Sequence, residues 1–415
     1  MSDWKTVPLA SLVENLDSRR VPVKRSERQS GLYPYYGASG IVDWVGSYLF
    51  DGEHLLVAED GENLNSRSVP IAFRATGKFW VNNHAHILKG PTHLLRYLEH
   101  FLNNLDVAGW VTGSAQPKLT QGNLNSIPIY LPTDDDELKA IARVLGALDD
   151  KIELNRRMNR TLEELAAALF RSWFVDFDPV VAKAAGRKPA HLRPELAALF
   201  PAHWQDSELG EIPKGWRVAK LSAVASVNSR KLPRNYPHAE IEYLDISSVS
   251  EGVINGTTRL ARTSAPSRAQ RLVVHGDTIW SCVRPNRRSF ALIQDPPENM
   301  VVSTGFATLT PTCESAAFIY TATTTEDFTD YLTAHAEGSA YPAVRPDAFE
   351  NAPLVIPPPD VLKEFEKIVA PWLAQVAHNV RESRTLAALR DTLLPKLLSG
   401  ELRVKPAEKL VEAHT

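Results

Sequence analysis

Few patterns in this chain have the residue types and spacing that catalysis requires. An amino-methyltransferase needs an Asn/Asp-Pro-Pro-aromatic loop whose ring stacks on a flipped base, but Asp295-Pro-Pro-Glu298 ends in a glutamate, which cannot stack. Gly77-Lys78 lacks the upstream glycine and the following Ser/Thr of a phosphate-binding loop. Glu137 and Lys139 resemble half of a nuclease metal site, but this acidic run is better suited to the N-terminus of a helix. The sequence predicts no catalytic residue.

A metal site is not predicted either. His84 and His86 have the spacing of neighbours on one face of a strand, but a metal needs three or four ligands and no third is evident. The two cysteines, Cys282 and Cys313, are too few for a disulfide framework or a four-thiolate zinc site. We expect folding roles for the histidines, or a hydrogen bond near a ligand face, and reduced thiols.

Clusters of basic and amide side chains are the pattern that indicates a function. Phosphate contacts supply most of the affinity for DNA, while Arg suits guanine and Asn or Gln suits adenine in the major groove. The alternative for each cluster is a solvated charged face. The residues that we predict to contact DNA are Arg19, Arg20, Lys24, Arg25, Gln116, Lys118, Arg230, Lys231, Arg284, Asn286, Arg287, Arg288, Tyr341 and Arg345. The acidic segment Glu59–Asn63 is instead expected to have a structural or turn role.

The overall charge gives no support to this prediction by itself. The chain has 46 Lys+Arg and 49 Asp+Glu, a net charge of -3, whereas nucleic-acid binders usually carry a basic surplus. Residues 133–178 carry 7 basic and 11 acidic side chains, so much of the acidic excess lies in one segment. We expect protein partners at that segment and weak, salt-sensitive DNA binding by the chain alone.

The chain repeats itself, which determines the predicted organisation. Gly113–Pro132 recurs without a gap as Gly338–Pro357, at an offset of 225 residues. Each copy is followed by a long segment whose apolar residues recur every three or four positions, as on one face of a helix. The predicted fold class is therefore α+β, with two mixed α/β domains joined by two long antiparallel helices in a pseudo-two-fold internal repeat.

The two helices are predicted to pack through their apolar stripes. Asn155 and Asn379 occupy matching places in the middle, where a buried Asn sets register at some cost in stability. At 1.5 Å per residue, helices of this length would separate the two domains by roughly one to one and a half turns of DNA. The predicted seam comprises Ile141, Leu145, Leu148, Ile152, Asn155, Leu162, Val369, Trp372, Val376, Asn379 and Leu386.

Local patterns predict the smaller elements. Leu165 is placed in the first apolar stripe, and Pro371 and Pro395 are expected to interrupt or bend the second helix. Strands are predicted at 54–60, 70–75, 78–89, 277–283, 300–310 and 317–323. Helices are predicted at 94–105, 138–174, 194–200 and 326–336.

The quoted residues also match a known family. The chain resembles the specificity subunit of type I restriction-modification systems. The motifs that carry the resemblance are Pro34-Tyr-Tyr-Gly-Ala-Ser-Gly-Ile41, Phe50-Asp-Gly-Glu53, Val57-Ala-Glu-Asp-Gly61, Trp80-Val-Asn-Asn-His-Ala-His86, Gly113-Ser-Ala-Gln-Pro-Lys118, Leu169-Phe-Arg-Ser-Trp-Phe174, Leu209-Gly-Glu-Ile-Pro-Lys-Gly-Trp216 and Leu393-Leu-Pro-Lys-Leu-Leu-Ser-Gly-Glu-Leu402. Single motifs are weak, but their order and the duplicated layout are specific.

The resemblance implies a non-catalytic subunit with two target-recognition domains, each reading one half of a split DNA site. It implies domain boundaries at 1–132 and 216–357 for these domains, at 133–178 and 358–415 for the long helices, and at 179–215 for a linker. The implied partners are double-stranded DNA, two methyltransferase subunits and two motor-nuclease subunits. S-adenosylmethionine belongs to the methyltransferase partner, and no cofactor is expected in this chain.

Two other function classes remain open at this point. A coiled-coil scaffold without DNA specificity would explain the long helices, and a fused DNA methyltransferase or nuclease would require the catalytic motifs that are missing. Met1-Ser-Asp-Trp-Lys5 has no apolar signal core and no long apolar run occurs, so we expect a cytoplasmic protein that does not contact a membrane.

Overall fold

The computed structural model describes residues 4–113, 116–338, 341–402 and 404. The chain divides into two compact units, one formed by Met1–Asn155 with Arg381–Thr415 and the other by Arg156–Val380. Two 40-residue helices, α4 (Asp135–Phe174) and α10 (Pro359–Leu398), each contribute one half to each unit. We call the units unit 1 and unit 2.

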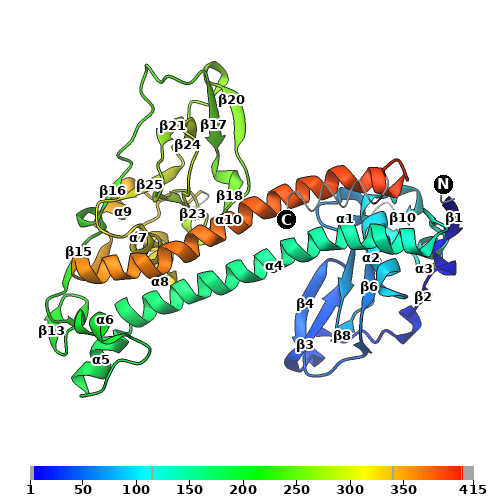
Figure 1. Ribbon diagram of the computed structural model, residues 1–415, viewed down its shortest axis with the longest axis horizontal. Coiled ribbons are helices and arrows are strands. Elements are labelled where there is room, and N and C mark those ends of the chain that lie inside the picture. The colour runs from blue at the N-terminus through cyan, green and yellow to red at the C-terminus, as the bar shows by residue number, and fades with distance from the viewer. Residues whose placement is uncertain (1–3, 114–115, 339–340, 403, 405–415) are drawn as a thin grey trace. The chain divides into compact units, whose positions relative to one another are not determined.

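Unit 1 contains two four-stranded sheets and helix α2, Thr92–Asn104 (Figure 1). One sheet has the order β2-β9-β6-β7 and the other β4-β3-β8-β5, with β3 parallel to β8 and the other pairs antiparallel. The strands are β2 Glu14–Asn15, β3 Ser30–Gly37, β4 Gly40–Val45, β5 Phe50–Asp51, β6 His54–Ala58, β7 Ala72–Ala75, β8 Lys78–Val81 and β9 Ala85–Lys89. The remaining elements are β1 Trp4–Pro8, which pairs with β12 Pro128–Pro132, the hairpin of β10 Val111–Thr112 and β11 Lys118–Leu119, and helices α1 Asn63–Ser66 and α3 Gln121–Ser126.

Unit 2 repeats this topology strand for strand. Its sheets have the orders β16-β25-β22-β23 and β20-β17-β24-β21, and β17 is parallel to β24 as β3 is to β8. The strands are β16 Ala225–Val227, β17 Glu240–Leu244, β20 Thr258–Ala261, β21 Ala269–Leu272, β22 Thr278–Ser281, β23 Phe290–Leu292, β24 Met300–Ser303 and β25 Phe306–Pro311. β15 Arg217–Lys220 pairs with β26 Pro353–Ile356 in the way that β1 pairs with β12. The predicted α+β class and the internal repeat are confirmed.

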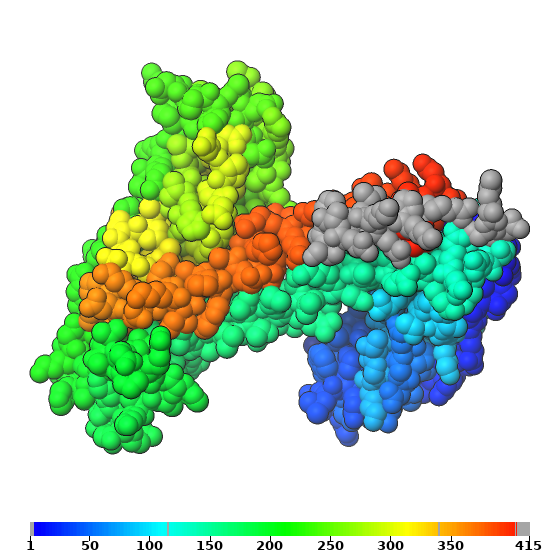
Figure 2. All heavy atoms as spheres, in the orientation of Figure 1, coloured from blue at the N-terminus to red at the C-terminus, as the bar shows by residue number. Residues whose placement is uncertain are grey.

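Unit 2 also contains elements without a counterpart in unit 1. After α4 come α5 Asp178–Ala184, α6 Pro194–Ala198 and the hairpin of β13 Trp204–Ser207 and β14 Gly210–Pro213. The globule adds the hairpin of β18 Val249–Ser250 and β19 Val253–Ile254. Two helices, α7 Ala316–Thr323 and α8 Glu326–Ala334, follow β25 where α2 alone follows β9, and α9 Pro346–Asn351 is the repeat equivalent of α3. Figure 2 shows the first half of α10, in orange, at the surface of this unit.

The halves of α4 and α10 pack antiparallel in each unit. In unit 1 the Asp149 carboxylate lies 2.9 Å from the Arg390 guanidinium, and the Asn155 amide donates to Glu382 at 2.6 Å. In unit 2 the Asn379 amide donates to the Asn159 oxygen at 2.7 Å. Asn155 and Asn379 are both buried, so each helix places one polar group in an otherwise apolar contact.

Most of the predicted seam is buried. Ile141, Leu145, Leu148, Ile152, Val369, Val376 and Leu386 are buried, and Leu162 and Trp372 are partly buried. Leu165, however, is 47% exposed, so its place in the stripe was wrong. The buried face there passes through Ala166, Phe170 and Trp173, because a straight helix of 3.6 residues per turn drifts away from a fixed seven-residue repeat.

Three other local predictions were wrong. Residues 317–323 form helix α7 and not a strand, since the Ser315 hydroxyl caps the helix by accepting from the Phe318 N–H. The segment 78–89 is two strands, because Asn82 accepts from the His84 N–H and makes a turn between β8 and β9. A turn likewise divides 300–310 between β24 and β25.

Helix α10 passes through both of its internal prolines. Each proline removes one helical hydrogen bond, yet α10 is continuous from Pro359 to Leu398. Burial of Val369 and Leu373 beside Pro371, and of Leu393 and Leu397 beside Pro395, offsets this loss. Among the described residues, no helix is apolar enough over a sufficient length to cross a membrane.

Replacing Trp173 by alanine should destabilise unit 2 by about 3 to 5 kcal/mol, the usual cost of deleting a large core aromatic side chain. Trp173 is 1% exposed and packs edge-on against Phe200, with ring centroids 5.2 Å apart. Urea unfolding followed by tryptophan fluorescence and circular dichroism measures the change. Leu165→Ala on the same helix is the control and should change the free energy of unfolding by less than about 0.5 kcal/mol; equal effects of the two variants would contradict this assignment of the core.

Candidate nucleic-acid interface

Two loops of unit 1 are held together by backbone hydrogen bonds. The first, residues 59–63, follows strand β6, and the second, residues 113–119, ends in β11. The Leu119 N–H donates to the Glu59 carbonyl at 2.7 Å, and the Gly61 N–H donates to the Pro117 carbonyl at 3.1 Å. We call these segments the unit 1 loop pair.

Unit 2 has the same pair of loops at the equivalent place. They comprise residues 282–288, after β22, and 338–345, before α9. The Val344 N–H donates to the Cys282 carbonyl at 2.8 Å, and the Arg284 N–H donates to the Pro342 carbonyl at 2.7 Å. Val344 and Pro342 are the repeat equivalents of Leu119 and Pro117. The unit 2 loop pair therefore has the same backbone frame.

A glycine begins the second loop of each pair. Gly113 and Gly338 both have positive φ, at 86° and 91°. A Cβ on Gly113 would lie 2.5 Å from the Gln116 carbonyl oxygen, and one on Gly338 would lie 3.3 Å from that of Tyr341. The loop geometry explains why these repeat positions are glycine. Residues 114–115 and 339–340 of the quoted motifs lie outside the described part of the chain.

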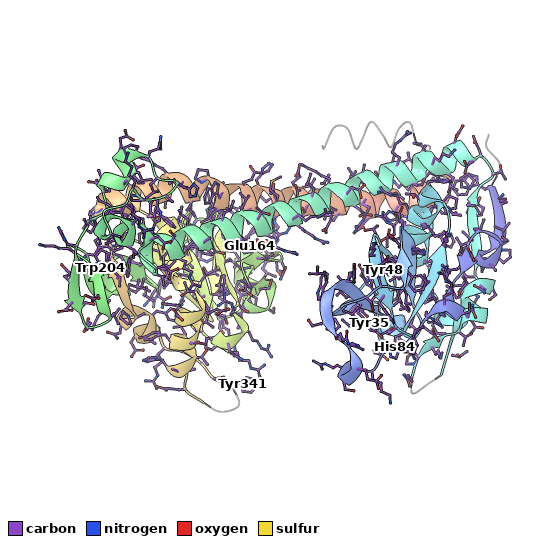
Figure 3. The ribbon with its side chains drawn as sticks, turned by 90° about the horizontal axis from the view of Figure 1, so that it is seen from below. Tyr35, Tyr48, His84, Glu164, Trp204 and Tyr341 are labelled. Carbon is purple, nitrogen blue, oxygen red and sulfur yellow. The ribbon has the colours of Figure 1, made fainter. Side chains whose placement is uncertain are left out.

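The unit 1 loop pair presents hydrogen-bond acceptors together with a lysine. Asp60 accepts from His84 Nδ1 at 2.8 and 2.9 Å, and His84 is about half exposed. Gln116 is exposed, and the Lys118 ammonium lies 3.1 Å from Glu59. Figure 3 shows His84 with Tyr35 and Tyr48 in this unit. Lys118 and His84 are thus paired with the acidic residues Glu59 and Asp60 of the first loop. These pairs reduce the positive charge that the unit 1 loop pair can offer to DNA.

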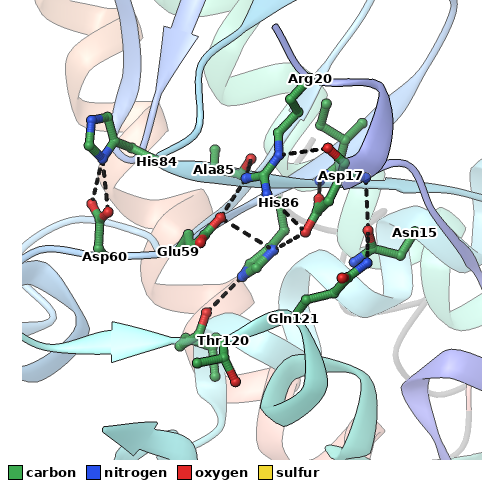
Figure 4. Close-up of polar contacts among 12 residues, drawn as sticks. Asn15, Asp17, Arg20, Glu59, Asp60, His84, Ala85, His86, Thr120 and Gln121 are labelled. Atoms are coloured by element: carbon green, nitrogen blue, oxygen red, sulfur yellow. Dashed lines mark hydrogen bonds and ion pairs between the residues drawn. The ribbon is translucent and has the colours of Figure 1, made fainter. Parts of the chain in front are cut away.

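A buried ionic cluster lies beneath this loop (Figure 4). His86 is fully buried, with Nδ1 2.5 Å from Asp17 and Nε2 2.7 Å from the Leu119 carbonyl. Since both partners accept, both ring nitrogens donate. The Arg20 guanidinium lies 2.5 Å from Glu59 and also donates to the Ala85 carbonyl at 2.9 Å. The cluster thus ties β9, β11 and the first loop together.

The two carboxylates of the cluster are ionised against the cost of burial. Burial opposes ionisation of Asp17, but His86, the Ile87 N–H and Arg20 hold its pKa below the ordinary value. Burial likewise opposes ionisation of Glu59, but hydrogen bonds and charge from Arg20, His86 and Lys118 lower its pKa.

The structure separates the two histidines that were predicted to share a strand face. His84 lies in the turn before β9 and pairs with Asp60, whereas His86 lies within β9 and is buried, so the prediction of one common face was wrong. Asp17, Glu59 and His86 are close enough to offer three ligands to a metal ion. Their ligand atoms are already engaged by Arg20, Lys118 and the Leu119 carbonyl, so this geometry favours an internal ion-pair cluster.

The unit 2 loop pair presents cations and amides. The Arg284 guanidinium lies 4.8 Å from the ring centroid of Tyr341, which is 71% exposed. Asn286 and Arg287 are exposed on the short turn between these loops and β23. Arg345 is also exposed and lies 2.7 Å from Glu337. Figure 3 labels Tyr341 at the edge of this unit.

Arg20 and Arg288 have extensive internal contacts. Arg20 has a side chain only 14% exposed and contacts two carboxylates. Arg288 pairs with Glu251 at 2.7 Å, donates to the Thr329 hydroxyl at 2.7 Å and donates to the Thr324 carbonyl at 2.9 Å. These contacts position the loops, and they involve residues far away in the sequence.

The other predicted DNA contacts lie on exposed turns and strand ends. Arg19, Lys24 and Arg25 follow β2 in two short turns, and the Arg19 guanidinium lies 5.7 Å from the Phe50 ring centroid. Lys231 is exposed, and Arg230 donates to the Thr310 hydroxyl at 2.9 Å. The pairing of Asp60 with His84 was not predicted, and only the proximity of β6 and β9 reveals it.

Several known proteins are similar to this chain. A family model described as the type I restriction modification DNA specificity domain matches residues 1–164. A putative type I restriction enzyme specificity subunit of Haemophilus influenzae is 40% identical over 148 residues, which are 35% of this chain and 37% of that protein. A type I restriction enzyme specificity subunit of Methanocaldococcus jannaschii is 25% identical over 428 residues, which cover 97% of this chain and 94% of that protein.

A solved structure shares the fold. The S subunit of a type I restriction-modification system from M. genitalium matches with a TM-score of 0.62 at 15% identity, over 95% of this chain and 96% of that one. The resemblance inferred from the sequence is confirmed, since the matching family model and these relatives are described as type I restriction specificity domains or subunits.

Asp17→Asn should destabilise unit 1 by about 3 to 5 kcal/mol at pH 7, because it leaves a buried cationic partner without its counter-charge. The folded-state pKa of Asp17 is lowered, so its contribution is present above the unfolded pKa and is lost as the pH falls through the folded value. The difference from wild type should therefore shrink below about pH 4. Urea unfolding at pH 7 and at lower pH tests this, with exposed Asp51→Asn as the control; a difference that does not depend on pH would contradict the ion-pair account.

Proposed function

We propose that this chain acts as a type I specificity subunit and selects a split, asymmetric DNA site, with each loop pair reading one half of it. The observation that carries the proposal is one backbone frame, held by matching hydrogen bonds in both units, that presents different side chains. A shared frame places side chains at equivalent positions on DNA, and different side chains at those positions select different bases.

The unit 2 loop pair has the chemistry of a guanine and adenine reader. Arginine can donate two hydrogen bonds to guanine, and asparagine can pair with both N6 and N7 of adenine. Arg287 and Asn286 are exposed on one turn, and Tyr341 lies beneath the Arg284 guanidinium, restricting its orientation. We assign Arg287 and Asn286 to base contacts, and Arg284, Tyr341 and Arg345 to their support or to neighbouring phosphates.

The unit 1 loop pair has the chemistry to read exocyclic amino groups. The Asp60 carboxylate, oriented by His84, can accept from cytosine N4, and Gln116 can bind adenine through its amide. Lys118 offsets the negative charge of Glu59 at this place. The unit 1 loop pair presents mainly hydrogen-bond acceptors, and the unit 2 loop pair presents mainly donors. The two units would then read different half-sites, so the complete site would be asymmetric.

The cations that surround these loops are proposed to contact phosphates. Arg19, Lys24 and Arg25 serve this role in unit 1. In unit 2 it is served by exposed Lys231 and by Arg230, which is partly buried and lies 3.5 Å from Asp277. Phosphate contacts fix the position of the protein on the duplex without reading sequence. Arg20 and Arg288 act indirectly by holding the loops.

The reaction chemistry is assigned to partner subunits. No residue pattern in the chain meets the requirements of a methyltransferase or nuclease site, and the relatives are named specificity subunits of type I restriction enzymes. We propose that methyltransferase subunits, which would supply S-adenosylmethionine, dock on the outer faces of α4 and α10. Motor-nuclease subunits would join this complex to cleave unmodified DNA, and the whole assembly would act in the cytoplasm.

Variants of the loop side chains should alter one half of the methylated motif and leave the other intact. Asn286→Ala and Arg287→Ala should relax one half, and Gln116→Ala the other, each reducing discrimination at one base pair by about 1 to 3 kcal/mol. Mapping of methylated adenines across the genome, in cells that co-express a type I methyltransferase subunit, measures the motif.

Exposed Arg217→Ala, in β15 and outside both loop pairs, is the control and should leave the motif unchanged. If the methylated motif is the same in all the loop variants as in wild type, the assignment of base contacts is wrong. Adenine methylation by this chain alone with S-adenosylmethionine would show that it is not a purely directing subunit.

Lys24→Ala should weaken DNA binding equally for all sequences and lower the slope of log affinity against log salt by about one. Fluorescence anisotropy of the assembled methyltransferase complex, with a duplex carrying the mapped site at several KCl concentrations, measures both quantities. Lys139→Ala on α4 is the control and should leave the slope unchanged. A change of preferred sequence in Lys24→Ala would reassign this residue to base reading.

A further inference from the structure

A cavity of about 890 Å³ lies within unit 2, between the second half of α4 and the globule. Helix α4 contributes Glu163 and Phe170, and the globule contributes Glu251, Phe290, Tyr320 and Glu326. Among the residues of the two loop pairs, only Arg288, at the end of the 282–288 loop, lines the cavity. Its walls combine aromatic rings with carboxylates, which is the composition that binds organic cations.

Glu163 is a carboxylate without a cation to balance it. It is partly buried, and among the described residues no hydrogen bond or ion pair reaches its side chain. Burial, followed by the charges of Glu251 and Glu164, raises its pKa above the ordinary value. A carboxylate that has lost hydration without gaining a partner costs stability, and a bound cation would recover that cost.

Tyr320 provides a second, independent observation. Its side chain is only 9% exposed, it lines the cavity, and in the described part of the chain its hydroxyl has no hydrogen-bond partner. The hydroxyl and Glu163 face the same place beside Gly252, since a Cβ built there would be 3.4 Å from the Tyr320 oxygen and 3.6 Å from Glu163 Oε1. The ring of Tyr320 is buried while its hydroxyl is open to the cavity, so a ligand in the cavity can reach both the hydroxyl and Glu163.

The two arginines that line the cavity do not fill this role. Arg288 is engaged by Glu251 at 2.7 Å and by Thr329, and Arg171 is engaged by Asp176 at 2.9 Å. Glu163 therefore remains open, while Glu326 and Asp327 add negative charge at the exposed rim. The local field attracts a positive group toward Glu163.

We propose that this cavity binds the cationic end of an arginine or lysine side chain presented by another polypeptide, with Glu163 and Tyr320 as its polar contacts. The guanidinium or ammonium group, which can only donate hydrogen bonds, would pair with the Glu163 carboxylate. The Tyr320 hydroxyl would donate a second hydrogen bond to the same carboxylate. The aliphatic stem would lie against Phe170 and Phe290. This site is independent of how the loop pairs read DNA.

The test uses the full chain and two blocked amino acids that differ only in charge. N-acetyl-arginine methylamide should bind, as measured by ligand-observed NMR titration, and N-acetyl-citrulline methylamide, its neutral counterpart, should bind at least about tenfold more weakly. Glu163→Gln should weaken binding of the arginine probe by about tenfold, and Tyr320→Phe by about threefold. Glu164→Gln, on the exposed next residue of the same helix, is the matched control and should bind like wild type.

Thermal unfolding keeps this test separate from misfolding. Glu163→Gln should unfold at the same temperature as wild type or a higher one, because it removes an uncompensated charge. Equal binding of the two probes, or equal effects of Glu163→Gln and Glu164→Gln, would overturn the proposal. Tighter binding of spermidine than of the arginine probe would assign the cavity to a free polyamine and overturn the choice of a polypeptide. None of these results depends on the recognised DNA motif, so they are distinguishable from failure of the proposed function.

Discussion

The structure depends on burying one apolar face of each long helix against segments far away in the sequence. In unit 1, Leu386 and Leu393 of α10 belong to the same core as Leu55 and Leu95 of the N-terminal globule. In unit 2, Phe170 and Trp173 of α4 pack with Phe365 of α10 and with Phe318 of the globule. Neither helix half could be stable alone at this length in water, because most helical stability in proteins comes from tertiary packing. Unit 1 is therefore complete only when the C-terminal half of α10 is present.

This constraint separates the parts of the chain that must be kept from those that are free to vary. The loop frame is made by backbone N–H and carbonyl groups, which every non-proline residue has, and by two glycines at positive φ. Exposed tip residues such as Gln116 and Arg287 contribute little to that frame. Replacing them changes the chemistry presented to a ligand without costing the fold, so one architecture can serve two recognition tasks in a single chain.

The sequence was informative where a pattern is local or repeated. The period of the apolar residues located both long helices, and the 225-residue offset between Gly113 and Gly338 identified two equivalent domains. It failed at α7, whose β-branched and aromatic residues favour a strand, because the Ser315 cap and burial in the core override that propensity. It could not distinguish Arg20 and Arg288 from exposed arginines, since Glu59 and Glu251 lie in distant turns that only the fold brings near.

Those internal arginines affect how much of the positive charge reaches the surface of the protein. A net charge of -3 lacks the basic surplus that is usual in nucleic-acid binders, and several of the cations also balance carboxylates inside the units. Arg20, Arg74 and Arg288 all form close ion pairs with low exposure, so they add little field outside the protein. Other cations, such as Arg19 and Lys24, lie on exposed turns and remain available to phosphates. Because phosphate contacts supply much of the affinity for DNA, the ion pairs inside the units determine which cations remain available for such contacts.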